Sequence, residues 1–317
     1  MSRMQTSTFR NPTAKVGPCS GGPDLKRAVA RLSEAYRAGR RTSEAGLSPA
    51  ETVAAYLAVR HPATLAASTA VLSEARSRLP GETIRSLLDL GAGTGASAQA
   101  AAIVFPELKD LVLIEPDAAF AQAGRELLPD ARWVAQMPEF PPSDLVMACY
   151  SLGELDRGSL PKVLAACWRA AHTLLVLIEP GSARGFAVIR EARDYVLALG
   201  AHMVAPCPHQ GACPVPAGDW CHFGQRVART SLHRRLKDAG LSYEDEKFSY
   251  VVLSRVACSP ARGRVVRRPS YRPGLVELEV CQGTEIRSER ISKSQGDRYR
   301  AARKAAWGSA WDRGSHV

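Results

Sequence analysis

The sequence has no apolar run long enough to cross a membrane. Its longest uninterrupted apolar segments, such as Leu174–Ile178, are far shorter than the roughly 20 residues that a transmembrane helix requires. It also has no charged segment followed by an apolar one near its start, so we expect no secretory signal, no membrane partner and no secreted partner. Without such a signal, the eight cysteines are not expected to form a disulfide framework.

Acidic residues are scarce in the last part of the chain. Residues 255–317 hold 14 Lys and Arg against 6 Asp and Glu, a net charge of +8, although the whole chain carries only +11. A basic segment attached to a nearly neutral body indicates a polyanionic partner, most often a nucleic acid. The alternative is that these arginines serve solubility alone.

The chain divides into four segments by pattern. We expect a disordered leader (1–23), an N-terminal helical segment (24–80), an α/β domain (81–254) and a basic β-rich C-terminal region (255–317). The helical segment is rich in Ala, and Pro62 is expected to separate two helices there. Within the α/β domain, strand-like runs such as 84–90, 111–115 and 173–179 alternate with helix-like runs. This alternation predicts a parallel, Rossmann-like sheet with helices on both faces.

A glycine turn follows the first strand-like run, in the stretch LDLGAGTGAS. Gly91 and Gly93 allow the backbone to approach a ligand closely. With Ala96 they also satisfy the dinucleotide fingerprint, in which Glu115 would bind a ribose hydroxyl. Asp89 favours a different cofactor, because a carboxylate repels a pyrophosphate but attracts the ammonium and sulfonium of S-adenosylmethionine. We therefore predict that Asp89, Gly91, Gly93 and Glu115 bind S-adenosylmethionine; the alternative is a turn that no longer holds a cofactor.

Catalytic residues are not evident. The place of an Asn/Asp-Pro-Pro-aromatic motif, which is typical of enzymes that methylate base nitrogens, reads ACYSLGEL at residues 148–155. Cys149 is expected to be a buried strand residue rather than a nucleophile. Glu154 and Glu179 are available as bases, but each can equally cap a helix or hold a loop. The catalytic residues therefore stay unassigned.

A second candidate site lies in PCPHQGACPVPAGDWCHF, residues 206–223, where no helix or strand pattern fits. Thiolates gathered in such a loop usually bind a metal. The candidates are Cys207, Cys213, Cys221 and the remote Cys258, whereas Cys281 has no ligand-like neighbours in sequence. The tight Cys-x2–4-Cys spacing of structural zinc is absent, and proline after two of the cysteines resembles some iron–sulfur proteins. Zinc completed by His209 or His222, and free thiols, remain the alternatives.

Four separated stretches together resemble a known family. They are AYLAVRHPAT (55–64), LLDLGAGTG (87–95), the cysteine stretch 206–223 and YEDEKFSYV (243–251). They are similar to the mitochondrial small-ribosomal-subunit Rsm-type methyltransferase-like proteins and their bacterial relatives. The resemblance implies a class I methyltransferase fold and a 4Fe–4S cluster. By position, its ligands would be Cys207, Cys213, Cys221 and Cys258.

The resemblance also implies association with the small ribosomal subunit or its rRNA. Two functions follow from it: a methyltransferase-like protein that acts in ribosome assembly or translation without catalysis, and an active rRNA methyltransferase. We expect a cytoplasmic location, with the mitochondrial matrix as the alternative.

The RNA would be held by the C-terminal region. The stretch ARGRVVRRP offers Arg262, Arg264, Arg267 and Arg268. Alternate residues of an extended segment share a face, so Arg262 and Arg264 are expected to lie together beside a phosphate backbone. Tyr271 could stack on an unpaired base. The alternative is a solvated edge strand protected from aggregation by its charges.

Overall fold

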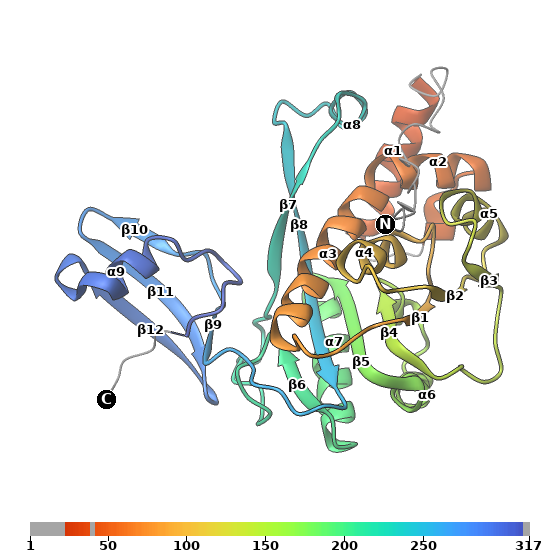
Figure 1. Cartoon of the computed structure of the whole chain (residues 1–317). Coiled ribbons are helices and arrows are strands. Elements are labelled where there is room, and N and C mark those ends of the chain that lie inside the picture. Colours follow the sequence, from red (N-terminus) through yellow and green to blue (C-terminus); the bar gives the residue numbers. More distant parts are fainter. Residues whose placement is uncertain (1–22, 39–41, 313–317) are drawn as a thin grey trace, which may run out of the picture.

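The computed structural model describes residues 23–38 and 42–312. A large body contains the central sheet and most helices, and a smaller C-terminal sheet stands beside it (Figure 1). The leader predicted over residues 1–23 lies outside the described residues except for its last position. Every helix within the described ranges is too short or too polar to cross a membrane.

The N-terminal segment forms three helices. They are α1 (Pro23–Arg37), α2 (Pro49–Val59) and α3 (His61–Arg78), with a short 3-10 turn, η2 (Thr42–Ala45), between the first two. Ser48 and Glu51 form a capping box that starts α2. Pro62 lies in the first turn of α3, where its missing N–H costs no helical hydrogen bond. The predicted separation of two helices at Pro62 is therefore confirmed.

The central sheet has the strand order β3-β2-β1-β4-β5-β8-β6. The strands from β3 to β5 pair in parallel, whereas β8 is antiparallel to both β5 and β6. Their bounds are β1 (Ser86–Leu90), β2 (Asp110–Ile114), β3 (Arg132–Val134), β4 (Ser143–Cys149), β5 (Ala171–Pro180), β6 (His202–Ala205) and β8 (Tyr243–Ser254). This order, with one antiparallel strand inserted near the edge, is the class I methyltransferase fold, so the predicted fold class is confirmed.

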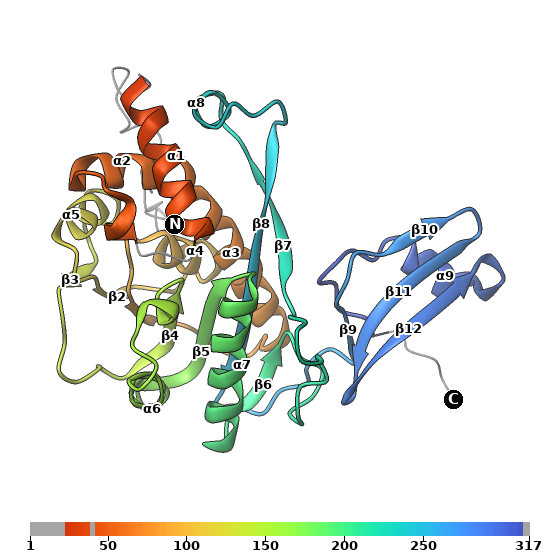
Figure 2. The same ribbon diagram turned by 180° about the vertical axis from the view of Figure 1, so that it is seen from behind.

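Helices cover both faces of the central sheet (Figures 1 and 2). α3 and α4 (Ala96–Val104) pack on one face, and α6 (Leu160–Ala170) and α7 (Ala183–Ala198) on the other. Neighbouring residues of one strand serve opposite faces: Leu87 packs with α3 and α4, and Leu88 with α6 and α7. A strand buried on both faces must be apolar throughout, which explains runs such as residues 173–178. The connections between strands of the central sheet also contain α5 (Ala118–Leu127) and η3 (Leu152–Glu154).

β8 continues beyond the sheet as one arm of a long hairpin with β7 (Phe223–Ala228). The tip of the hairpin carries α8 (Ser231–Leu236) and lies near the N-terminal helices (Figure 2). Leu236 packs with Leu25 and Val29 of α1. Lys26 and Asp238 add an ion pair at 2.7 Å. The hairpin therefore links the end of the α/β domain to the N-terminal helical segment.

The C-terminal region forms a second, antiparallel sheet around β11. The strands are β9 (Gly263–Val265), β10 (Ser270–Arg272), β11 (Leu275–Gln282) and β12 (Glu285–Ser292), followed by η4 (Lys293–Gln295) and α9 (Gly296–Ala302). β11 pairs with all three other strands. Val276, Leu278 and Val280 alternate along β11 onto one face, where Ala302 and Trp311 complete a separate core.

Candidate functional site

A pocket of about 540 Å³ opens at the carboxyl ends of β1, β2 and β4, where open α/β sheets bind ligands. Its volume is within the usual range for small-molecule sites. Gly91, Gly93 and Glu115 line it as predicted, and α1 and α2 each contribute one tyrosine, Tyr36 and Tyr56. The complete lining is Tyr36, Tyr56, Leu90, Gly91, Gly93, Ile114, Glu115, Pro116, Asp117, Phe120, Cys149, Tyr150, Ser151, Leu152, Glu154 and Leu155.

The two predicted glycines face different surroundings. Both adopt positive φ, +71° at Gly91 and +57° at Gly93, a conformation that other residues rarely take. A Cβ atom at Gly91 would lie 2.4 Å from the Cβ of Ser151. A Cβ atom at Gly93 would meet the side chain of Tyr56 at ordinary contact distance, 3.6 Å from its hydroxyl. Gly91 therefore permits close packing of the loop after β4, and Gly93 leaves pocket space open.

Asp89 lies beneath the turn rather than on the pocket wall. Its side chain is fully buried, and Ser97 at the start of α4 donates a hydrogen bond to Oδ2. Within the part of the chain that the structure describes, Oδ1 has no hydrogen-bond partner. Burial raises the pKa of this carboxyl to about 7. The structure thus places Asp89 beside the predicted site, with one buried oxygen unsatisfied, and does not show it lining the pocket.

Glu115 follows β2 and does line the pocket. Its two oxygens accept hydrogen bonds from the backbone N–H groups of Gly93, at 2.7 Å, and Asp117, at 2.8 Å. Burial raises the pKa of Glu115, and these two bonds act in the opposite direction. Glu115 therefore fixes the glycine turn against the loop after β2, and its carboxylate still faces the pocket.

Sequence analysis did not identify the residues that support this pocket from beneath the glycine turn. His61 lies under the turn, with Nδ1 2.7 Å from the Thr94 hydroxyl and Nε2 3.2 Å from Oε1 of Gln99. Burial lowers the pKa of His61 to about 4, so the ring is neutral at pH 7. The stretch AYLAVRHPAT was visible as part of the family resemblance, but its contact with the glycine turn follows only from the fold.

Arg60 joins two of the distinctive stretches. Its guanidinium forms two hydrogen bonds of 2.9 Å to Glu246 of β8. It also lies 4.6 Å from the ring centre of Tyr36 and 5.7 Å from that of Tyr150. The Tyr150 hydroxyl donates to Glu246 at 3.2 Å. A bidentate, partly buried pair flanked by aromatic rings holds its geometry well, so Arg60 and Glu246 fix the pocket wall after β4.

The titratable side chains at the loop after β4 include Cys149, Glu154 and Glu179. Burial raises the pKa of the Cys149 thiol well above its usual value, so this thiol is not a nucleophile near neutral pH. Oε1 of Glu179 accepts from the backbone N–H groups of Leu152, at 2.8 Å, and Gly153, at 3.2 Å. Glu179 therefore holds η3 in place. Glu154 lines the pocket.

The cysteine loop surrounds a second cavity. Cys207, Cys213 and Cys221 line it as predicted, and Cys281 of β11 lines it too. Burial raises the pKa of Cys207, Cys221 and Cys281, to about 12 for the last. Among the described residues, no three Cys, His, Asp or Glu side chains are grouped so that they could hold a single metal ion. Four thiols nonetheless border one space.

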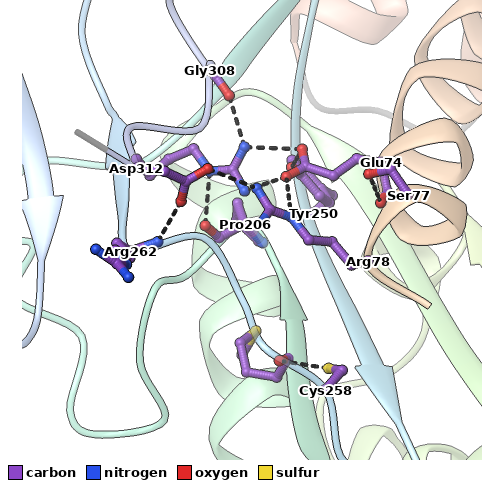
Figure 3. Close-up of polar contacts among 11 residues, drawn as sticks. Glu74, Ser77, Arg78, Pro206, Tyr250, Cys258, Arg262, Gly308 and Asp312 are labelled. Atoms are coloured by element: carbon purple, nitrogen blue, oxygen red, sulfur yellow. Dashed lines mark hydrogen bonds and ion pairs between the residues drawn. The ribbon is translucent and has the colours of Figure 1, made fainter. Parts of the chain in front are cut away.

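Cys258 does not belong to this cavity, contrary to the position-based expectation. Its thiol donates to the carbonyl of Met203, at 3.3 Å, and lies apart from the neighbouring polar network (Figure 3). Cys281 pairs with Arg264 across β11 and β9, which brings it to the loop from the second sheet. Cys281 is 60 residues from Cys221, so no local sequence pattern connected it with the cysteine loop.

Arg264 connects the two sheets at this point. Its guanidinium forms a bidentate ion pair with Glu74 of α3. It also donates to the carbonyls of Pro206, at 2.8 Å, and Gly308, at 2.9 Å. Figure 3 shows these partners converging from helix, loop and C-terminal tail. The side chain of Arg264 is only 2% exposed.

This position corrects the predicted arginine row. Arg264 points into the joint, so it cannot share an RNA-facing surface with Arg262. Arg267 is paired with Asp219 of the cysteine loop. Arg262 and Arg268 are exposed, and Tyr271 is 47% exposed. Arg264 is buried in an ion pair with Glu74 of α3, and the local strand pattern could not indicate this partner.

Comparison with known proteins gives matches over most of the chain. The family model described as "Mitochondrial small ribosomal subunit Rsm22" matches residues 50–312. The human "Ribosome assembly protein METTL17, mitochondrial" is 28% identical over 282 residues, 80% of this chain and 61% of the relative. The Schizosaccharomyces pombe "Rsm22-cox11 tandem protein 2, mitochondrial" is 27% identical, over 70% of this chain and 38% of the relative. The chain thus spans about three fifths or less of the length of these curated relatives.

Among solved structures, magnesium protoporphyrin IX methyltransferase from Synechocystis is similar with a TM-score of 0.40 and 13% identity, over 73% of this chain and 97% of that one. The family match is the more extensive result, because it begins in α2 and ends just after Trp311. The matched residues include the glycine turn, the cysteine cavity and the joint between the sheets. The chain therefore belongs to the Rsm22 family, whose description is that of a mitochondrial small ribosomal subunit protein.

Proposed function

We propose that this chain acts in assembly of the small ribosomal subunit, binds S-adenosylmethionine in the pocket and holds an iron–sulfur cluster in the cysteine cavity. Family membership is the observation that carries the ribosomal role, and the name of the human relative supports assembly in particular. The names of the curated relatives support the mitochondrial matrix as the compartment. They give no support to the cytoplasmic location expected from the sequence.

The pocket residues suit S-adenosylmethionine. Asp89 lies beneath the pocket with its buried Oδ1 unpartnered among the described residues, and a carboxylate in this position favours a nearby ammonium or sulfonium. Glu115 would accept from ribose hydroxyls, and Gly93 leaves room for the ligand backbone. The rings of Tyr56 and Phe120, which pack edge to face at 5.0 Å, offer an apolar wall. When bound, this cofactor supplies a transferable methyl group.

A binding role agrees better with the loop after β4 than catalysis does. Tyr150 is held by Glu246, Glu179 is engaged by backbone N–H groups, and Cys149 is protonated. Active methylation of rRNA is the second candidate, favoured by the glycine turn and Glu115. Transfer of tritium from labelled S-adenosylmethionine to small-subunit particles would separate the two, with Asp89→Ala as the negative control. Transfer by the wild type alone would establish the enzyme.

The cysteine cavity suits a four-thiolate cluster. In a 4Fe–4S cluster each thiolate binds a different iron, so the sulfur ligands surround the cluster rather than one ion. Four cysteines around one space provide one thiolate for each iron of such a cluster. The proposed ligands are Cys207, Cys213, Cys221 and Cys281, with Cys281 replacing Cys258. Such a cluster would tie the second sheet to the α/β domain.

Metal analysis tests this assignment with a matched pair of cysteines. Protein purified without oxygen should contain about four irons and four sulfides per chain. Cys281→Ser should lose both, whereas Cys258→Ser should retain them. Stoichiometric zinc without iron, in protein made with iron available, would contradict the cluster. Loss of iron from Cys258→Ser with retention in Cys281→Ser would contradict the ligand assignment.

The exposed arginines of the C-terminal region remain the proposed RNA contacts. Arg262, Arg268 and Tyr271 are exposed, and the Arg303 guanidinium lies 5.8 Å from the centre of the Tyr271 ring. Cations beside an exposed aromatic ring suit a single-stranded segment, because phosphates and a stacked base can be held together. Arg264 is left out of this surface because it is buried.

A further inference from the structure

Arg193 of α7 is buried against the cysteine cavity. Its side chain is 4% exposed and lines the cavity. Nη2 donates to the carbonyls of His209, at 3.2 Å, and Gly211, at 2.7 Å, both in the cysteine loop. Nη1 pairs with Asp194, whose side chain is 52% exposed. Nε is buried and has no hydrogen-bond partner among the described residues. A donor and a positive charge therefore stand at the cavity without full compensation.

Arg193 and the cysteines border the same space. The side chain of Arg193 lines the cavity together with Cys207, Cys213, Cys221 and Cys281. Arg264 lines the same cavity from the second sheet and bonds the carbonyl of Pro206, next to Cys207. The carboxylate of Asp194 is screened by water, because it is half exposed, whereas the guanidinium is not. The charge of Arg264 is balanced by Glu74, whereas the buried charge of Arg193, beside four thiols, matches an anionic occupant.

We propose that Arg193 is a positioning residue of the cysteine cavity that raises the reduction potential of the bound cluster. A 4Fe–4S cluster with four thiolates is an anion, and its reduced form carries one more negative charge. A buried cation therefore stabilises the reduced form more than the oxidised form. This inference rests on the proposed cluster. The same side chain also holds the cysteine loop by two hydrogen bonds to carbonyls. Substitutions are therefore needed to separate the effect of its charge from its effect on the position of the loop.

The test compares Arg193→Gln, which removes the charge, with Arg193→Lys, which keeps it. Arg169→Gln is the control, since Arg169 is an exposed arginine on the neighbouring helix α6. Each protein is purified without oxygen, its iron and sulfide are counted, and its midpoint potential is measured by titration with dithionite followed by visible absorption and electron paramagnetic resonance. We expect a lower potential in Arg193→Gln, and values near the wild type in Arg193→Lys and Arg169→Gln.

The outcomes separate this inference from the proposed function. Absence of iron from the wild type would refute the cluster itself. Full iron with an unchanged potential in Arg193→Gln would overturn the inference and leave the cluster standing. If Arg193→Gln loses iron, Arg193→Lys decides: iron retained at the wild-type potential supports the role of charge. Loss of iron from Arg193→Lys as well would show that the arginine only holds the loop, and would overturn the inference.

Discussion

Replacing Glu74 by Gln should destabilise the joint between the two sheets by about 3 kcal/mol. Glu74 is the carboxylate partner of Arg264, and the two side chains are 20% and 2% exposed. Removing one partner of a buried ion pair costs roughly 3–5 kcal/mol, because the remaining charge is left uncompensated. Water reaches one side of Glu74, so we expect the lower end of that range. The carbonyls of Pro206 and Gly308 still accept from Arg264 but carry no full charge.

Urea unfolding followed by tryptophan fluorescence measures this change, because Trp307 and Trp311 lie close to the joint. Glu285→Gln is the matched control: its pair with Arg287 is about 60% exposed on both sides and should contribute less than about 1 kcal/mol. The double variant Glu74→Gln with Arg264→Met should recover part of the loss, since no buried charge remains. A loss below about 1 kcal/mol in Glu74→Gln, equal to the control, would refute the reasoning.

Three further predictions concern the pocket and the RNA surface. Gly93→Val should abolish binding of S-adenosylmethionine in calorimetry, because it fills pocket space at a positive φ; binding of NAD alone by the wild type would refute the cofactor assignment. The stability advantage of Asp89→Asn over the ligand-free wild type should grow as pH rises from about 4 to about 7 and then level off. Burial raises the pKa of Asp89 from 3.8 to about 7, so ionisation of this carboxyl costs the folded wild type stability over that range. A difference in melting temperature that does not change with pH would contradict this. Arg268→Ala should flatten the logarithmic salt dependence of rRNA binding by roughly 0.7–0.9, unlike Arg169→Ala; an unchanged slope would exclude Arg268 as a phosphate contact.

The predicted fold followed from local pattern. Strand-like and helix-like runs alternated with short links, and both the glycine turn and Glu115 fell at strand ends. In a parallel sheet those ends lie along one edge, so residues far apart in sequence meet there for a general reason. The local pattern was sufficient because the central strands β4 and β5 are buried on both faces and form apolar runs.

The sequence by itself determined the sheet, the position of the glycine turn and three of the cysteines around the cavity, because each of these depends on residues close together in the chain. Only the tertiary structure decided the fourth. Cys281 reaches the cavity because β11 pairs with β9, and Arg264 on β9 forms an ion pair with Glu74 on α3. The same buried pair removed Arg264 from the expected RNA surface. Neither the burial of a charged side chain nor the pairing of strands that are distant in sequence produces a local periodic pattern. Neither could therefore be predicted from the sequence alone.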